Sequence, residues 1–112
     1  MAVFVIIEAE PFEHQLESLT LIEKQRVERF IVQLNEKGNH VGKPLGYLFF
    51  REKKFNGKRL YFLVYEEWSA ILLTAISSKK EQNETIAEIK KQLPEYRGFV
   101  YKKLREMNLI WP

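Results

Sequence analysis

The apolar residues of the first third of the chain change from a continuous run to a helical spacing. Ala2–Glu8 is short, β-branched and apolar, which predicts a buried strand. Pro11 suits the start of a first helix. Thr20 and Glu23 then fit a capping box, and Gly38 is suited to end a second helix in a left-handed conformation. The apolar stripe of this second helix consists of Ile22, Val27, Phe30, Ile31 and Leu34.

The middle of the chain alternates between apolar and polar residues, as strands do. Residues 38–46 contain three glycines and one proline, which predicts a loop. Tyr47–Lys54 and Lys58–Glu66 predict two strands, joined by Asn56-Gly57, a pair that readily adopts the positive φ angles of a tight hairpin turn. After a further turn, Ala70–Ile76 predicts a third strand of this sheet.

Alternation in the second strand of the hairpin divides its side chains between two faces. Leu60, Phe62 and Val64 lie on one face, which we expect to be core. The other face carries a basic group and two phenols, and we expect it to be the working surface of the protein. Its residues are Arg59, Tyr61, Leu63 and Tyr65.

The last third of the chain returns to helical spacing. Ser78 and Glu81 fit a second capping box, the apolar stripe beyond them ends at Pro94, and a further helix is predicted through about Met107. The expected fold class is therefore α+β, in the order β-α-α-β-β-β-α-α, with a small and mainly antiparallel sheet packed by helices. No repeat or linker interrupts the chain, so we expect a single domain over residues 1–112.

Composition excludes several kinds of site. The 112 residues include no cysteine, which removes disulfides, cysteine nucleophiles and cysteine-ligated metals. The two histidines, His14 and His40, are too few for a convincing zinc or copper site, and the 15 acids are all Glu, which argues against calcium loops. We therefore expect no metal and no cofactor. Apolar runs fall far short of the roughly 20 residues of a membrane span, and the start lacks the features of a secretion signal. We expect a cytoplasmic protein without membrane contact.

The net charge of +3 hides an uneven distribution. Residues 1–36 carry a net charge of −4, whereas residues 37–59 hold seven bases against Glu52 alone, a net charge of +6. Such a basic segment attracts polyanions, of which nucleic acid is the commonest in the cytoplasm. The alternative is a solvated hairpin whose lysines protect an edge strand from pairing with other chains.

The usual catalytic motifs of hydrolases and nucleotide-binding enzymes are absent, so any chemistry must come from Lys, Arg, Glu and Tyr. RNA cleavage is compatible with this set, because RNA carries its own nucleophile in the 2′-hydroxyl. The protein then has to align that hydroxyl, stabilise charge on the phosphoryl oxygens and move two protons. An arginine suits the phosphoryl oxygens, and a Glu or Tyr suits the deprotonation.

Several short motifs, in their order and spacing, resemble the RelE/ParE superfamily of toxins, especially its HigB-like branch. The resemblance covers roughly residues 1–93, with 94–112 as a C-terminal helical extension. The motifs that carry it are Gly42-Lys43-Pro44, Arg51-Glu52, Asn56-Gly57-Lys58-Arg59-Leu60, Ser78-Lys79-Lys80-Glu81-Gln82 and Glu88-Ile89.

The resemblance implies the toxin of a type II toxin–antitoxin system, a metal-independent endoribonuclease (mRNA interferase) that cleaves translated mRNA at the ribosome and so inhibits translation. The implied partners are mRNA, the ribosome and an acidic antitoxin, with a homodimer or a hetero-oligomer with the antitoxin both left open. Two alternatives remain within the same fold. One is a non-catalytic binding module, and the other is a gyrase-directed, ParE-like toxin.

The resemblance implies a role for each matching residue. Arg59 is expected to contact the scissile phosphate, and Lys79 and Lys80 are expected to hold phosphate or to support the leaving group. Glu52 matches an acidic position that some members use as a base, although it also suits a cross-strand partner for Arg59 or Lys58. The expected RNA-binding residues are Arg51, Lys53, Lys54 and Lys58, with Tyr61 and Tyr65 as stacking surfaces. The Tyr or His that many relatives carry after the last strand is missing from Glu81–Thr85.

Overall fold

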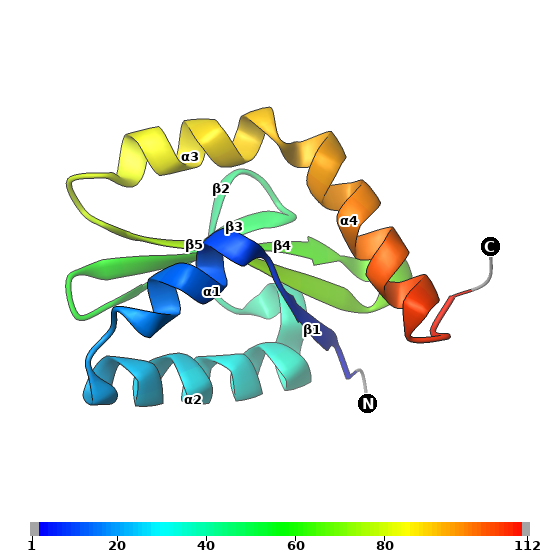
Figure 1. Ribbon diagram of the computed structural model, residues 1–112, viewed down its shortest axis with the longest axis horizontal. Coiled ribbons are helices and arrows are strands. Elements are labelled where there is room, and N and C mark those ends of the chain that lie inside the picture. Colours follow the sequence, from blue (N-terminus) through cyan, green and yellow to red (C-terminus); the bar gives the residue numbers. More distant parts are fainter. Residues whose placement is uncertain (1–2, 111–112) are drawn as a thin grey trace.

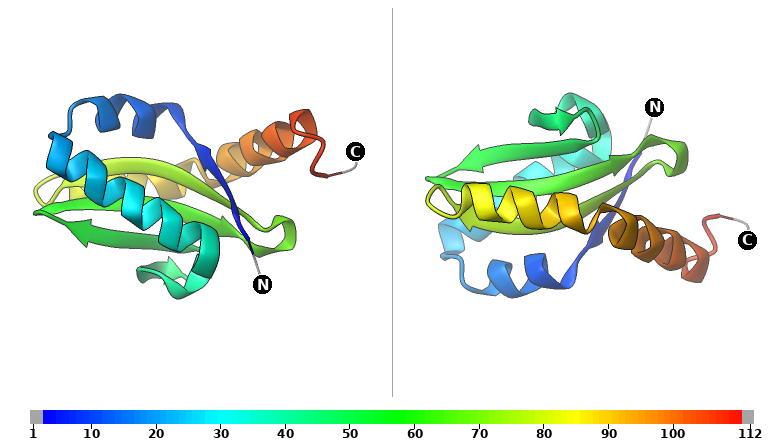
Figure 2. Two further views of the ribbon diagram at one scale, coloured as in Figure 1. Left: turned by 90° about the horizontal axis from the view of Figure 1, so that it is seen from below. Right: turned by 90° about the horizontal axis from the view of Figure 1, so that it is seen from above.

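A five-stranded sheet with two helices on each face makes up the described part of the chain, residues 3–110 of a computed structural model (Figures 1 and 2). The strands are β1 (Val5–Glu8), β2 (Lys43–Tyr47), β3 (Phe50–Phe55), β4 (Lys58–Tyr65) and β5 (Ala70–Ser78). The helices are α1 (Glu10–Glu17), α2 (Leu21–Lys37), α3 (Gln82–Lys91) and α4 (Leu93–Glu106), with short 3₁₀ turns η1 (Gly38–His40) and η2 (Glu66–Trp68).

The strands follow the order β1-β5-β4-β3-β2, in which β1 runs parallel to β5 and the other neighbours are antiparallel. The predicted α+β class and mainly antiparallel sheet are thus confirmed. Figure 2 shows α1 and α2 on one side of the sheet and α3 and α4 on the other. The turn between β3 and β4 and the connection from β5 to α3 lie at the same end of the molecule (Figure 1), which we call the hairpin end.

One strand was not predicted. The expected loop over residues 38–46 is wrong in its second half, because Lys43 and Pro44 pair with β3 as part of β2. A proline is compatible with this position, since an edge strand needs hydrogen bonds on one side only. The expected strand Tyr47–Lys54 is correspondingly divided, with Tyr47 ending β2. The first expected strand begins later than predicted, at Val5, because Val3 and Phe4 are not part of the strand, and its expected first residue, Ala2, lies outside the described residues.

Both faces of the sheet are core. Leu60, Phe62 and Val64 of β4 are core, as predicted, and they pack in one apolar cluster with residues of α1 and α2. Tyr61 and Leu63 of β4 lie in a second apolar cluster, which α3 and α4 cover. The prediction that this second face is an exposed working surface is therefore wrong, because the two C-terminal helices fold back over it (Figure 2).

A bulge in β5 keeps these two faces in register. Tyr61 pairs with Ala75 and Phe62 pairs with Leu73, so Thr74 is an extra residue on β5. The buried Thr74 hydroxyl donates a hydrogen bond to the carbonyl oxygen of Tyr61 at 3.1 Å, which satisfies both groups in the interior. The bulge restores the alternation of apolar residues on its two sides.

Positive φ angles occur at two predicted turns. Asn56 and Gly57 have φ angles of 46° and 75°, as a two-residue hairpin turn requires. Gly38 ends α2 as predicted, but with a φ of 57° and a ψ of −120° it does not have the expected left-handed helical conformation, and a Cβ there would collide with the ring of Phe4. The chain can therefore leave α2 beside β1 only because this residue is glycine.

A single carboxylate connects α2 to the hairpin. The predicted capping box is confirmed, since the Glu23 amide donates to the Thr20 hydroxyl at 3.2 Å and the Thr20 amide donates to Glu23 Oε1 at 3.0 Å. The other oxygen, Glu23 Oε2, accepts from Asn56 Nδ2 at 2.8 Å and from Lys58 Nζ at 2.7 Å. We call these four contacts the Glu23 bridge. The contacts with Lys58, the Thr20 amide and Asn56 lower the pKa of Glu23 from 4.5 to about 2.

Replacing Glu23 with Gln should remove an acid-sensitive part of the stability. The folded protein holds this carboxylate ionised while the unfolded chain protonates it near its ordinary pKa of 4.5, so the contribution is full above that pH and is lost as the pH falls toward about 2. We expect wild type to be more stable than Glu23→Gln at pH 7 and the difference to shrink toward zero near pH 2, as measured by urea unfolding. Glu28→Gln, an exposed position on the same helix, is the control, and an equal pH dependence in both variants would contradict the assignment.

Candidate functional site

Three polar residues meet at the hairpin end, on the α3 side of the sheet. Arg59 pairs across the sheet with Lys54 on β3 and Ser77 on β5, so these side chains share one face. Arg59 Nε lies 4.0 Å from Glu52 Oε1, and Gln82, the first residue of α3, donates to the same oxygen at 3.1 Å. We call Glu52, Arg59 and Gln82 the Arg59 cluster. Glu52 is 3% exposed and Arg59 is 6% exposed.

The Arg59 guanidinium is incompletely satisfied. Its Nε is buried and makes no hydrogen bond with the described residues, since Glu52 is too distant and turned toward Gln82. Its Nη1 donates only at 3.5 Å, to the carbonyl oxygen of Gly57. A buried donor without a partner costs about 1–3 kcal/mol. An oxyanion that reached this position would supply the missing acceptor, although the side chains at the start of α3 would have to move aside to admit it.

Lys79 and Lys80 are exposed in the turn that leads into α3. Glu81 and Ser78 exchange hydrogen bonds around this turn, with the Ser78 amide and the Glu81 amide each donating at 3.3 Å. The pairing predicted for a capping box is thus present, but α3 begins only at Gln82 and has no side-chain cap of its own. The two lysines therefore stand before a free helix N-terminus, where an anion is favoured.

The two tyrosines expected to stack on bases are in the core. Tyr61 is fully buried, and its hydroxyl forms a 2.8 Å hydrogen bond with Ser77 Oγ. Burial raises the pKa of Tyr61, so this hydroxyl stays protonated and cannot act as a base at neutral pH. Tyr65 is also buried and stacks on Trp68 with ring centroids 5.6 Å apart. Base stacking does not fit either position, because α3 and α4 cover that face.

The side chain of Arg51 stabilises the fold by hydrogen bonds to the backbone. It is 9% exposed, and its guanidinium donates to the carbonyl oxygens of Val41 at 2.8 Å, Gly42 at 2.9 Å and Leu48 at 3.2 Å. These bonds tie both ends of β2 and its flanking turns to β3. The expected contact of Arg51 with RNA does not fit, since its donors are directed at the protein backbone.

The remaining predicted residues divide between two sides of the hairpin. Lys58 is committed to the Glu23 bridge. Lys53 lies on the α2 side, with its Nζ 6.0 Å from the ring centroid of Phe30. Lys54 is exposed and is the cross-strand neighbour of Arg59. The structure thus gathers Lys54, Glu52 and Arg59 near the turn that carries the exposed lysine pair, and Tyr61 is buried opposite Glu52. Arg51, Lys53 and Lys58 are directed elsewhere.

Gln82 had no predicted role, although it belongs to the Ser78–Gln82 motif of the sequence resemblance. Nothing in its own sequence context signals a contact with Glu52, which is 30 positions away. The contact arises because the connection from β5 to α3 folds back beside β3. Only the arrangement of the strands could have identified it.

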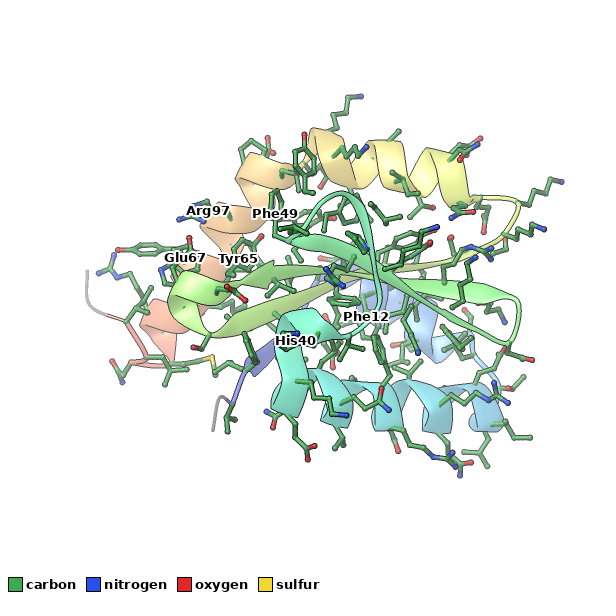
Figure 3. The ribbon with its side chains drawn as sticks, turned by 180° about the vertical axis from the view of Figure 1, so that it is seen from behind. Phe12, His40, Phe49, Tyr65, Glu67 and Arg97 are labelled. Carbon is green, nitrogen blue, oxygen red and sulfur yellow. The ribbon has the colours of Figure 1, made fainter. Side chains whose placement is uncertain are left out.

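A larger hollow, of about 440 Å³, lies away from the hairpin end. Figure 3 shows Phe49, Tyr65, Glu67 and Arg97 gathered there, beside α4. The lining is mostly apolar, and Arg97 is already paired with Glu67 at 3.0 Å and placed 4.5 Å from the Trp68 ring centroid. This hollow lacks free groups for proton or phosphate chemistry, so we place the candidate site at the Arg59 cluster.

Two further features of the described residues bear on function. Within residues 3–110, no three side chains of His, Cys, Asp or Glu gather as they would around a metal ion. In the same range, no helix has the length and apolar character needed to cross a membrane.

The chain matches no protein-family model and no curated protein sequence, but it is similar to several solved structures. A mutant of the E. coli toxin RelE in the free state is 19% identical, with a TM-score of 0.69 over 82% of this chain and 98% of that chain. A chain of the intact E. coli RelBE toxin–antitoxin complex is 15% identical, with a TM-score of 0.61 over 67% and 95%. A chain of a RelBE toxin–antitoxin complex from Mycobacterium tuberculosis is 17% identical, with a TM-score of 0.53 over 70% and 94%. This protein therefore has a RelE-like fold.

Substituting Arg51 should cost stability. Arg51→Ala leaves three backbone carbonyls without their donor, and Arg51→Lys cannot reproduce the fork that reaches them. We expect each variant to lose about 2 kcal/mol or more of unfolding free energy in urea titrations. Lys53→Ala, an exposed position on the same strand, should change stability by no more than about 0.5 kcal/mol. Equal stability of Arg51→Lys and wild type would contradict the structural role.

Proposed function

We propose that this protein is the toxin of a toxin–antitoxin system and cleaves translated mRNA at the ribosome without a metal ion. The observation that carries the proposal is the unpartnered, buried Nε of Arg59 beside the Glu52 carboxylate, in a RelE-like fold. An arginine held in this way has a donor free for a phosphoryl oxygen, and the neighbouring carboxylate is a proton acceptor.

The proposed reaction is an intramolecular transfer within the RNA. The 2′-oxygen attacks the adjacent phosphorus, a new P–O bond forms, and the bond to the 5′-oxygen of the next nucleotide breaks. Glu52 takes the proton from the 2′-hydroxyl, and the ammonium group of Lys79 or Lys80 gives a proton to the leaving 5′-oxygen. Arg59 stabilises the charge that develops on the phosphoryl oxygens. Lys54, next to Arg59 across the sheet, positions the RNA backbone.

The proposed partner in the inactive state is an acidic antitoxin. Solved relatives are toxin–antitoxin complexes from E. coli and Mycobacterium tuberculosis, which supports a partner of this kind. An acidic chain would neutralise the exposed lysines at the hairpin end, which face no acidic partner among the described residues: Lys53, Lys54, Lys79 and Lys80. We place this toxin and its target in the cytoplasm.

The burial of the Arg59 cluster favours a second candidate, a non-catalytic binding module. At 6% and 3% exposure, Arg59 and Glu52 are less accessible than a preformed nuclease site requires. In that case the polar cluster would serve to hold the hairpin against α3, and the exposed lysines would bind an anionic partner without chemistry. Cleavage assays separate the two candidates.

Arg59→Ala should slow cleavage strongly without abolishing the fold. Purified ribosomes translating a defined mRNA are incubated with the protein, and the cuts are mapped by primer extension. We expect codon-phased cuts with wild type and a rate lower by about 10²–10³-fold with Arg59→Ala, because a donor to the phosphoryl oxygens is lost. Circular dichroism and thermal unfolding report whether the variant is folded.

Because Arg59 is buried, its replacement also affects packing, so a second variant replaces two exposed residues of the proposed site. Lys79→Ala with Lys80→Ala should also slow cleavage, while Lys102→Ala with Lys103→Ala on α4 should not. No cuts from folded wild-type protein would contradict the nuclease proposal and favour the binding module.

Glu52→Gln tests the proton acceptor. The amide keeps the size of the side chain and its contact with Gln82, but it cannot take a proton, so we expect cleavage to fall by about 10²–10⁴-fold. Binding of the variant to ribosomes, measured by co-sedimentation, should be unchanged. Cleavage at the wild-type rate would show that Glu52 is only an ion-pair partner of Arg59.

A further inference from the structure

A basic groove runs between α2 and the β3–β4 hairpin, on the side of the sheet opposite α3. It encloses about 260 Å³. Its charged lining comes from two elements that are distant in the sequence, Arg26 and Arg29 on α2 and Lys53 and Lys54 on β3. Figure 2 shows α2 lying along the strands on this side. Between the charged residues lie Val27, Phe30, Gln33, Phe55 and Leu60. We call this the α2–hairpin groove.

The four cations of the groove are exposed, and none makes an ion pair within residues 3–110. No acidic residue lines the groove. Other bases of the described chain, such as Lys58 and Arg97, do have a glutamate within 3.0 Å. Four unpaired positive charges around one hollow repel one another in the free protein, and an anionic ligand would relieve that repulsion.

An open edge of the sheet connects the groove with the Arg59 cluster. β2 pairs with β3 only from Phe50 to Glu52, so the last part of β3, from Lys53 to Phe55, pairs with β4 on one side and has no strand on its other edge. Side chains alternate along this edge. Lys53 lies toward the groove, and Lys54 both lines the groove and pairs with Arg59. A chain bound at Arg59 can therefore pass Lys54 and enter the groove without crossing a covered face.

We propose that the α2–hairpin groove binds the single-stranded RNA that flanks the phosphate held by Arg59. Arg26, Arg29 and Lys53 contact successive backbone phosphates, and the half-buried ring of Phe55 offers a surface on which a base can stack. This inference rests on the proposed function, and it extends the RNA contacts from the hairpin to a helix that carries no expected site residue.

The lining favours RNA over an acidic peptide with apolar anchors. Val27, Phe30 and Leu60 are buried beneath the surface, so an apolar side chain would meet mainly the partly exposed ring of Phe55 and the alkyl parts of the basic residues. The polar groups of the lining are four cations and one amide. A continuous polyanion fits this surface better than a chain that needs a hydrophobic pocket.

The test is the affinity of charge-reversed variants for a 2′-O-methylated single-stranded RNA, which cannot be cleaved because it lacks the nucleophile. Fluorescence anisotropy at several salt concentrations gives the affinity and its salt dependence. Arg26→Glu with Arg29→Glu should weaken binding by about tenfold or more and lower the slope of log K against log[salt] by about 1.4, since each single-strand phosphate contact contributes about 0.7. Phe55→Leu should weaken binding by about fivefold.

The matched control is Lys102→Glu with Arg105→Glu. This pair has the same spacing and the same change of net charge, but it lies on α4, which covers the other side of the sheet. It should leave the affinity within about twofold of wild type, because long-range attraction is largely screened at physiological salt. An equal loss in control and groove variants would overturn the proposal.

Three other outcomes would also overturn it, and they have different consequences for the proposed function. If the groove variants bind RNA like wild type while Lys79→Ala with Lys80→Ala binds weakly, the groove is not an RNA site but the proposed function stands. If they lose only the binding of an acidic antitoxin peptide, the occupant is a protein. If wild type shows no salt-dependent binding of the RNA at all, the proposed function fails together with the groove.

Discussion

The carboxylate of Glu23 fixes the position of everything at the hairpin end. One oxygen completes the capping box with Thr20 and so defines where α2 begins, and the other binds Asn56 and Lys58 at the turn of the hairpin. A helix start and a strand turn separated by more than 30 residues are therefore held at one point. The β3–β4 hairpin would otherwise project beyond the helices with few contacts, and both the Arg59 cluster and the α2–hairpin groove depend on its placement.

Coverage of both sheet faces restricts where this small fold can act. The faces of β4 are used for packing, so polar chemistry is confined to the hairpin end and to the open edge of β3. This confinement explains how Arg59 comes to be buried with an unpartnered Nε, since α3 begins directly beside it. A buried guanidinium is costly, but its own orientation is held in place, so an anion that displaces the side chains at the start of α3 meets a donor that is already oriented.

The parts of this arrangement that depend on neighbouring residues could be predicted from the sequence. Contacts between distant segments could not be predicted. Asn56-Gly57 and Thr20 with Glu23 specify a turn and a helix start through neighbouring atoms alone, and both were predicted. β2 was missed because its Gly and Pro content is typical of a loop, and only pairing with β3 makes it a strand. The buried state of Tyr61 was missed for a related reason, since alternation separates the faces of a strand but does not reveal whether a later helix covers one of them.

For the basic segment, the charge counted along the sequence differs from the free charge that the folded protein presents at its surface. Of its bases, Arg51 is directed to backbone carbonyls and Lys58 to Glu23, so neither contributes a free positive charge to the surface. The fold compensates by bringing Arg26 and Arg29 to the same hollow as Lys53 and Lys54, although they come from a part of the sequence whose net charge is negative. The acidic residues of that part do not line the hollow. An anionic ligand responds to this local grouping, because beyond a Debye length of about 10 Å the remaining charges are screened.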